Sequence, residues 1–324
     1  MLINFLLCAI GFLLLYFGAE WLVKGSSSLA RSLGITPIVI GLTVVAFGTS
    51  APELVVSLVS SIKGNSMIAV GNVVGSNICN IALVMGMAAM LQPITSHRSV
   101  VVRDIPIMLA ISIYLLVLSW NSVLSRVEGA TLFGGVILYT VMNYYWVRSE
   151  KADSEAVSEV ISEVGEIGYI ASPRKQWIMI IAGVAGVVGG AELVVNSAIS
   201  IMMVLGVSEK FIGLTIVAFG TSLPELATSV VAALRKEMDI SIGNLVGSNV
   251  FNIMSVLGAA ALVRPIPIPG GFFASGLWID YLVMLGTSAL PLVMMIKTPV
   301  ITRGKGAVLF TSYVIYVVYL IAKA

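Results

Sequence analysis

Two glutamates, Glu53 and Glu225, stand within long apolar stretches of this 324-residue chain. Each belongs to one copy of a repeated block, Gly-Leu-Thr-Val-Val-Ala-Phe-Gly-Thr-Ser-Ala-Pro-Glu-Leu at 41–54 and its near-repeat at 213–226. A charged carboxylate at the centre of a membrane-spanning helix costs about 2.5–3.5 kcal/mol on insertion scales. Neither block contains a Lys or Arg that would neutralise its glutamate. We therefore expect the counter-charge to be mobile: a metal ion, sodium or protons.

The residues that precede each glutamate carry further oxygen atoms. Thr49 and Ser50 lie four and three residues before Glu53, which on a continuous helix places all three on one face. Pro52 removes a backbone donor and clashes with the preceding turn, so we expect the helix to break here. A break within a membrane is tolerated where the freed carbonyls, such as that of Ala46, face a cavity. The second copy supplies the equivalent residues Ala218, Thr221, Ser222, Pro224 and Glu225.

A second repeated block, Gly-Asn-x-x-Gly-Ser-Asn, lies at 71–77 and 243–249. Its serine shares a helical face with an asparagine four residues later, and the two copies supply Ser76, Asn80, Ser248 and Asn252. Together the two blocks could offer the about 6–8 oxygens that calcium prefers. The two glutamates carry a charge that one divalent cation cancels. The set contains no thiol or imidazole, which argues against zinc or copper.

Two further pairs within the repeat receive a different interpretation. Asn77 and Asn249 are predicted to be hydrogen-bond partners between helices, a common role of amides in membranes. Glu20 and Glu192 fall at the ends of apolar runs, so we interpret them as helix-end carboxylates rather than ligands.

The composition predicts an all-α membrane protein. Hydrophobic residues make up 58% of the chain, charged residues only 10%, and the mean hydropathy is +1.05, which is far from the soluble average. A spanning helix needs roughly 20 apolar residues. Runs of this kind between charged or Pro/Gly-rich breaks predict ten transmembrane helices at 3–22, 37–62, 65–92, 104–121, 127–147, 177–203, 209–234, 240–263, 275–296 and 304–322.

These spans form two repeats of five helices, 1–148 and 176–324, joined by an acidic linker at 149–175. Because five is odd, the second copy enters the membrane the opposite way up. This is the inverted repeat of secondary transporters, whose site lies near the midplane. Of the 18 Lys and Arg residues, 13 fall on the side of the linker. That side is predicted to be cytoplasmic, with both termini extracellular.

Several other classes are excluded by residue type. His97 is the only histidine, so HExxH metal sites and Ser/His pairs at any other position are ruled out, and no phosphate loop occurs. We therefore expect no enzyme and no cofactor. No basic cluster suggests nucleic acid as a partner. The acidic residues of the linker lack the spacing of a calcium-binding EF-hand loop, so we interpret it as a solvated segment.

The motifs Gly-Thr-Ser-x-Pro-Glu and Gly-Asn-x-x-Gly-Ser-Asn, each present twice, resemble the α-repeats of the cation/calcium exchanger superfamily over essentially the whole chain. The first motif is similar to that of sodium/calcium exchangers and their potassium-dependent and prokaryotic relatives. The resemblance implies ten helices around a central cluster of cation sites, with the first and sixth spans sliding to alternate access. It implies that Glu53 and Glu225 bind calcium and sodium, with backbone contributions from Ala46 and Ala218. It implies further ligands at Thr49, Ser50, Ser76, Thr221, Ser222 and Ser248.

This chain departs from the resemblance at one pair of positions. Many sodium-coupled relatives place an aspartate at one of the positions that match Asn80 and Asn252, and this chain has asparagine at both. The coupling ion is therefore open between sodium and protons.

The function expected is that of a secondary active antiporter in the cell membrane. It would exchange calcium for sodium by alternating access, with both cations competing for one midplane site, and a monomer is expected to suffice for transport. A calcium/proton exchanger that uses the same two glutamates is the alternative. A cation channel is a third candidate, since carboxylates and carbonyls also line filters. The expected partners are calcium ions, sodium ions and the lipid bilayer.

Overall fold

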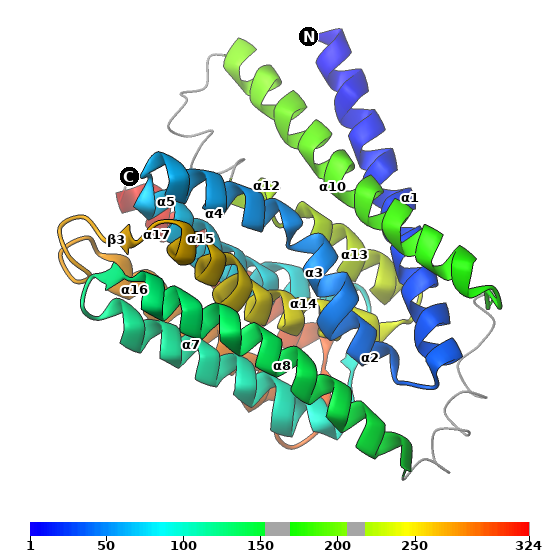
Figure 1. Cartoon of the computed structure of the whole chain (residues 1–324). Helices are drawn as coiled ribbons and strands as arrows, with labels where there is room; N and C mark the ends of the chain where they lie inside the picture. Colours follow the sequence, from blue (N-terminus) through cyan, green and yellow to red (C-terminus); the bar gives the residue numbers. More distant parts are fainter. Residues whose placement is uncertain (153–168, 206–217, 324) are drawn as a thin grey trace.

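The computed structural model describes residues 1–152, 169–205 and 218–323, and these form a bundle of helices (Figure 1). In the first half the elements are α1 (Leu2–Leu33), α2 (Pro37–Ile40), η1 (Gly41–Val45), α3 (Ala46–Thr49), α4 (Ala51–Lys63), α5 (Ser66–Ile78), η2 (Cys79–Met85), α6 (Gly86–Leu91), β1 (Ile94–Thr95), η3 (Val100–Asp104), α7 (Ile105–Ser119), β2 (Val123–Leu124) and α8 (Arg126–Ala152). In the second half they are α10 (Pro173–Val204), α12 (Ala218–Gly220), α13 (Leu223–Leu234), α14 (Met238–Phe251), η5 (Asn252–Leu257), α15 (Gly258–Val263), β3 (Ile266–Pro267), α16 (Leu277–Met295), β4 (Val300–Ile301) and α17 (Arg303–Lys323). The segments labelled η are π-helical turns.

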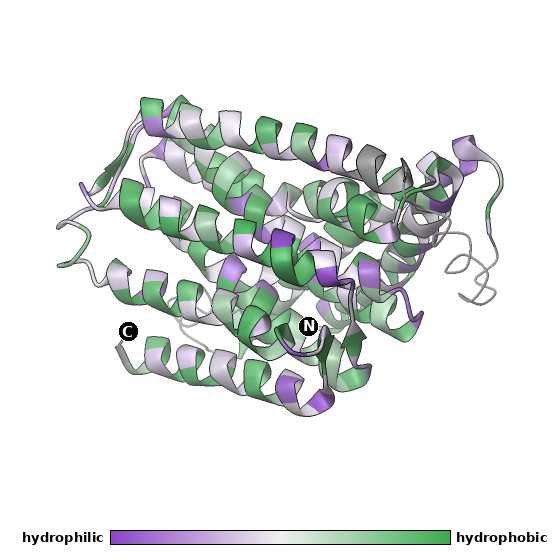
Figure 2. Ribbon diagram, turned by 90° about the horizontal axis from the view of Figure 1, so that it is seen from below, coloured by the Kyte–Doolittle hydropathy of each residue, from purple (hydrophilic) through white to green (hydrophobic). Residues whose placement is uncertain are grey.

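Helices occupy the positions of all ten predicted spans. Among the described residues, seven helical segments are long and apolar enough to cross a membrane, or eight if the bent pair at 37–49 and 51–63 counts as one span. The helix α8 and the pair α12–α13 fill the two remaining positions. Residues 209–217 of the seventh predicted span and 153–168 of the predicted linker lie outside the described residues. Hydrophobic residues run along the helices, and hydrophilic residues gather mainly toward their ends (Figure 2).

The strand pairings show that the two halves are inverted. The strand β1 pairs with β4, and β2 pairs with β3. β1 and β3 are equivalent in the repeat, since Ile94 and Ile266 occupy matching positions. However, β1 precedes the span η3–α7 and β2 follows it, so these two strands lie at opposite ends of the span. β3 pairs with β2 and not with β1. The same loop therefore ends up at opposite faces of the bundle in the two halves, as five spans per half require.

The centre of the bundle consists of α5–η2–α6 and its counterpart α14–η5–α15, both mostly buried. Their apolar residues form one large core cluster with parts of α7, α16 and α17. The chain ends α4 at Gly64, whose φ of 81° is left-handed and favours glycine. It starts the next long helix two residues later. This tight return packs α4 against α5 and so brings the polar blocks at 41–54 and 71–77 together inside the first half.

Helices α1 and α10 lie together on one side of the bundle and run antiparallel (Figure 1). Glycines at seven-residue spacing on α1, namely Gly11, Gly18 and Gly25, face α10. A Cβ added at Gly18 would lie 2.7 Å from the backbone nitrogen of Val187, so only glycine fits there. The helix α1 runs on to Leu33, well past the predicted span end at 22. The error arises because the polar segment after Trp21 stays helical outside the apolar run.

We expect Gly183→Ala to destabilise the protein. A Cβ at Gly183 would lie 2.6 Å from the backbone nitrogen of Leu22 on α1, and backbone cannot move aside as a flexible side chain can. Overpacking of this kind costs about 1–3 kcal/mol. The measurement is the melting temperature in detergent, and the matched control is Gly189→Ala on the same helix, where an added Cβ meets nothing within 4 Å. Equal melting temperatures for the two variants would contradict the close contact between the helices.

Candidate cation-binding site

The helices that carry the two glutamates are both broken just before them. The first bends by 45° at Ser50, whose φ of −79° and ψ of 8° lie outside the helical range, and α4 then starts with Pro52 in its first turn. The second breaks at Ser222, which has nearly the same dihedral angles. Glu53 and Glu225 therefore lie in the first turns of α4 and α13. The positive end of each helix dipole favours the ionised carboxylate there.

The hydroxyls around each carboxylate come from both halves of the chain. Ser50 Oγ donates to Glu225 Oε1 at 3.3 Å, and Ser248 Oγ donates to the same oxygen at 3.4 Å. Thr49 also lies beside Glu225, while the Glu53 carboxylate has the hydroxyls of Ser76 and Thr221 beside it. The sequence predicted Thr49 and Ser50 on the same face as Glu53. The structure differs because the chain turns at Ser50 and directs these hydroxyls toward the other half.

Several buried oxygen atoms at this centre have no hydrogen-bond partner within the described part of the chain. Both glutamates are fully buried, and both Glu53 oxygens and Glu225 Oε2 are unpartnered. The same holds for Asn80 Oδ1, Asn252 Oδ1 and Ser222 Oγ. Buried polar groups normally find partners. A set of unpartnered oxygens around two carboxylates therefore fits hard cations such as calcium or sodium.

Neither glutamate forms an ion pair with a Lys or Arg in the described residues, whose salt bridges lie elsewhere. The two carboxylates are near enough to repel one another. These residues also include no cluster of three His, Cys, Asp or Glu side chains that could hold a metal. Any cation at this centre would therefore take most of its ligands from hydroxyls, amides and backbone.

The remaining predicted ligands occupy different places around this centre. Asn80 and Asn252 lie in the π-helical turns η2 and η5, whose wider backbone is frequent at functional sites. Asn80 Nδ2 donates to Asn249 Oδ1 at 3.2 Å. The Ala46 carbonyl accepts the backbone N–H of Ser50 at 3.0 Å, and the Thr49 hydroxyl also donates to it at 3.4 Å. Ala218 is the first described residue of α12.

The two pairs interpreted as structural make contacts of that kind. Asn77 Nδ2 donates to the Asn249 carbonyl at 3.2 Å, and Asn249 Nδ2 donates to the Asn77 carbonyl at 3.2 Å. These reciprocal bonds join α5 to α14 where the two halves meet. Glu20 forms an ion pair with Arg235, away from the central carboxylates. Its counterpart Glu192 is exposed.

Two asparagines that were not predicted as ligands from the sequence also reach this centre. Asn72 and Asn244, the second residues of the Gly-Asn-x-x-Gly-Ser-Asn motif, contact Thr221 and Thr49 respectively. Their signal in the sequence was the repetition itself, since both copies retain an amide four residues before the motif serine. Without the fold, the repetition could not show which residues either side chain contacts.

The fold and the site define a multi-pass membrane transporter of cations built from two inverted repeats. The family model of the sodium/calcium exchanger protein matches residues 3–145 and 175–322, so the chain belongs to this family. It is therefore a cation/calcium antiporter of the sodium/calcium exchanger family and not an enzyme.

Similar proteins match along nearly the whole chain. The inner membrane protein YrbG of Escherichia coli is 35% identical over 99% of this chain and 97% of its own. The sodium/calcium exchanger MaX1 of Methanosarcina acetivorans is 34% identical over 98% of each chain. Among solved structures, the sodium-calcium exchanger NCX_Mj soaked with Na⁺ and Ca²⁺ is similar with a TM-score of 0.82 and 31% identity, covering 98% of both chains.

We expect Glu53→Gln and Glu225→Gln each to abolish stabilisation by calcium. A ligand present at 100 times its Kd stabilises a protein by about 2.7 kcal/mol, and this gain disappears when the binding charge is removed. The measurement is the calcium-dependent shift of the melting temperature. The matched control is Glu192→Gln, which alters an exposed glutamate of the same repeat and should keep the full shift. A full calcium shift in both site variants would remove these carboxylates from the binding site.

Proposed function

We propose that this antiporter exports calcium in exchange for entering sodium. The observation that carries the proposal is the pair of buried carboxylates, Glu53 and Glu225, with unpartnered oxygens and with hydroxyls drawn from both halves. The names of two relatives, MaX1 and NCX_Mj, support sodium as the coupling ion. We propose the ligand set Glu53, Glu225, Thr49, Ser50, Ser76, Asn80, Thr221, Ser222, Ser248 and Asn252, with the backbone of Ala46 and Ala218.

Exchange follows from competition for this one set of oxygens. One calcium ion neutralises both carboxylates, and so do two monovalent cations. An empty site would leave two unpaired charges in the bilayer. The protein therefore changes between its outward-facing and inward-facing states at low energetic cost only when cations occupy the site. Occupancy by calcium excludes sodium from the shared glutamates, which links the two fluxes.

Alternating access is proposed to arise from movement of α1 and α10 relative to the rest of the bundle. These two helices contact each other more extensively than they contact the core, and glycines line their interface. A small cavity lined in part by Phe47, Leu54 and Phe251 reaches Ser50, whose hydroxyl donates to Glu225.

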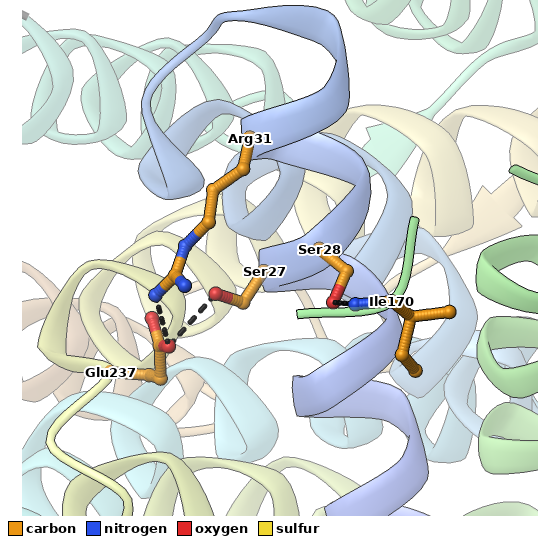
Figure 3. Close-up of polar contacts among 5 residues, drawn as sticks. All are labelled: Ser27, Ser28, Arg31, Ile170 and Glu237. Atoms are coloured by element: carbon orange, nitrogen blue, oxygen red, sulfur yellow. Dashed lines mark hydrogen bonds and ion pairs between the residues drawn. The ribbon is translucent and has the colours of Figure 1, made fainter. Parts of the chain in front are cut away.

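The helix α1 forms a charged contact with the core that has no equivalent at α10, its counterpart in the second half. Ser27 Oγ donates to Glu237 Oε1 at 2.8 Å, and Arg31 Nη2 donates to the same oxygen at 3.3 Å (Figure 3). In the sequence repeat, Asn65 occupies the position that matches Glu237, and Met203 the position that matches Arg31. The other half therefore has no charged pair equivalent to Arg31 and Glu237. By the distribution of Lys and Arg, this contact lies on the proposed cytoplasmic side. We infer that it holds that side closed.

The same distribution supports the proposed orientation. The loops joined by β1 and β4 carry Arg98, Lys297 and Arg303, whereas those joined by β2 and β3 carry Arg126 and Arg264. With the richer side cytoplasmic, the linker 149–175 is cytoplasmic and both termini are extracellular.

The function is tested by isotopic calcium uptake into proteoliposomes, with the sodium, potassium and proton gradients varied one at a time. An outwardly directed sodium gradient is expected to drive calcium uptake, and Glu53→Gln or Glu225→Gln to reduce it to the level of empty liposomes. Uptake driven by a pH gradient without response to sodium would select the calcium/proton exchanger. Uptake that needs no cation on the opposite side would select the channel.

We expect Glu237→Gln to loosen the contact between α1 and the α13–α14 turn. Burial raises the pKa of Glu237, and the Ser27 hydrogen bond and the Arg31 charge offset part of that rise. Removing the charge eliminates the ion pair, and hydrogen bonds to charged groups contribute about 1.5–3 kcal/mol. Hydrogen exchange of residues 234–240 is expected to accelerate by about tenfold. The control Glu192→Gln should leave that segment unchanged, and an unchanged rate in Glu237→Gln would mean that the contact does not hold α1.

A further inference from the structure

Asn72 joins the backbone of one glutamate to a hydroxyl of the opposite half. Its Nδ2 donates to the Glu53 carbonyl at 3.2 Å and to Ser57 Oγ at 2.9 Å, while its Oδ1 accepts the Thr221 hydroxyl at 3.4 Å. A backbone carbonyl only accepts, so the amide nitrogen must face Glu53. This fixes the orientation of the side chain and leaves Oδ1 toward Thr221. Ser57 also donates to the Ala69 carbonyl at 3.3 Å, so it accepts from Asn72.

Asn244, in the other half of the chain, likewise contacts a threonine and a serine, but the described structure gives it no bond to the Glu225 carbonyl. Its Oδ1 accepts the Thr49 hydroxyl at 3.0 Å, and its Nδ2 donates to Ser229 Oγ at 3.2 Å. Asn244 is fully buried and lies on α14, whereas Thr49 ends α3. Each asparagine is thus anchored within its own half and binds a threonine of the other. Ser50, which donates to Glu225, is crossed in the same way.

A threonine hydroxyl has one hydrogen to donate and two lone pairs to offer. If the hydrogen points to the neighbouring carboxylate, it occupies part of the space beside that carboxylate, and fewer lone pairs of the hydroxyl face a cation bound there. When the hydrogen is held by an asparagine oxygen instead, both lone pairs stay available beside the carboxylate. The acceptor of the hydrogen therefore decides how many lone pairs of the threonine hydroxyl face the cation.

We propose that Asn72 and Asn244 are positioning residues that hold the Thr221 and Thr49 hydroxyls as acceptors toward the transported cation. The inference rests on the proposed function only in taking calcium as one cargo of the site. It adds a role for two residues that need not touch the ion. Each asparagine acts on one threonine of the opposite half. Substitutions should therefore be coupled within the Asn72–Thr221 and Asn244–Thr49 pairs and independent between them.

The test is a double-mutant cycle on calcium binding by the purified full-length protein, read as the calcium-dependent shift of melting temperature and as KM in proteoliposomes. Asn72→Leu and Thr221→Val are each expected to weaken calcium binding by about five- to tenfold, the effect of one net hydrogen bond. Together they should weaken it by about fivefold less than the product of the single effects, because they remove the same interaction. Asn244→Leu with Thr49→Val should behave alike.

The matched controls exchange the partners. Asn72→Leu with Thr49→Val, and Asn244→Leu with Thr221→Val, should give effects that multiply, since no hydrogen bond joins these pairs in the described structure. Thr221→Ser retains the hydroxyl and should preserve the effect of Asn72→Leu. Where a leucine variant is not recovered folded, Asn72→Ala removes the same acceptor without added bulk. A merely structural role would lower the melting temperature without this crossed dependence.

The outcomes separate this inference from the proposed function. Multiplying effects in the Asn72–Thr221 and Asn244–Thr49 pairs, with normal calcium binding by the unaltered protein, would overturn the positioning role alone. Absence of calcium binding by the unaltered protein would overturn calcium as cargo. Combined effects smaller than the product in the Asn72–Thr221 and Asn244–Thr49 pairs, together with multiplying effects in the control pairs, support the inference.

Discussion

The carboxyl groups of Glu53 and Glu225 lie fully buried in a bundle of apolar helices, with no Lys or Arg paired to either in the described residues. An uncompensated buried charge is among the least favourable groups that a membrane protein can contain. Everything around the two residues reduces this cost without cancelling it. Helix N-termini, hydroxyls and amides offer partial positive charge or reorientable dipoles, but a full counter-charge has to arrive from solution.

The helix breaks are what make this partial compensation possible. At Ser50 and Ser222 the chain starts a new helix, so each carboxylate meets backbone N–H groups in a first turn. Neither serine caps its helix by a side-chain hydrogen bond, so the hydroxyls stay available to the site. Ser50 uses its hydroxyl on the glutamate of the opposite half. Continuous helices would satisfy the backbone better but would leave the carboxylates surrounded by apolar side chains.

The sequence alone could predict the spans and the central pair of glutamates, because hydropathy and repetition need no knowledge of contacts. The third span, predicted at 65–92, is observed as Ser66–Leu91. The neighbours of each glutamate could not be predicted in the same way. The assignment of Thr49 and Ser50 to the face of Glu53 assumed one straight helix, and the bend at Ser50 removed that premise. The partners of Asn72 and Asn244 lie 149 and 195 positions away, beyond any local pattern.

The crossed contacts have a consequence for how such a protein could be assembled from smaller parts. Residues 1–148 contain one carboxylate but only some of the hydroxyls around it, since Thr221 belongs to the other half. A single half-length chain would therefore hold no complete site. Two such chains inserted into the bilayer in opposite directions would complete the site together. A half-length chain that bound ions would thus have to insert in both orientations and pair as an antiparallel homodimer, and fusion of two copies through a linker would fix that pairing within one polypeptide.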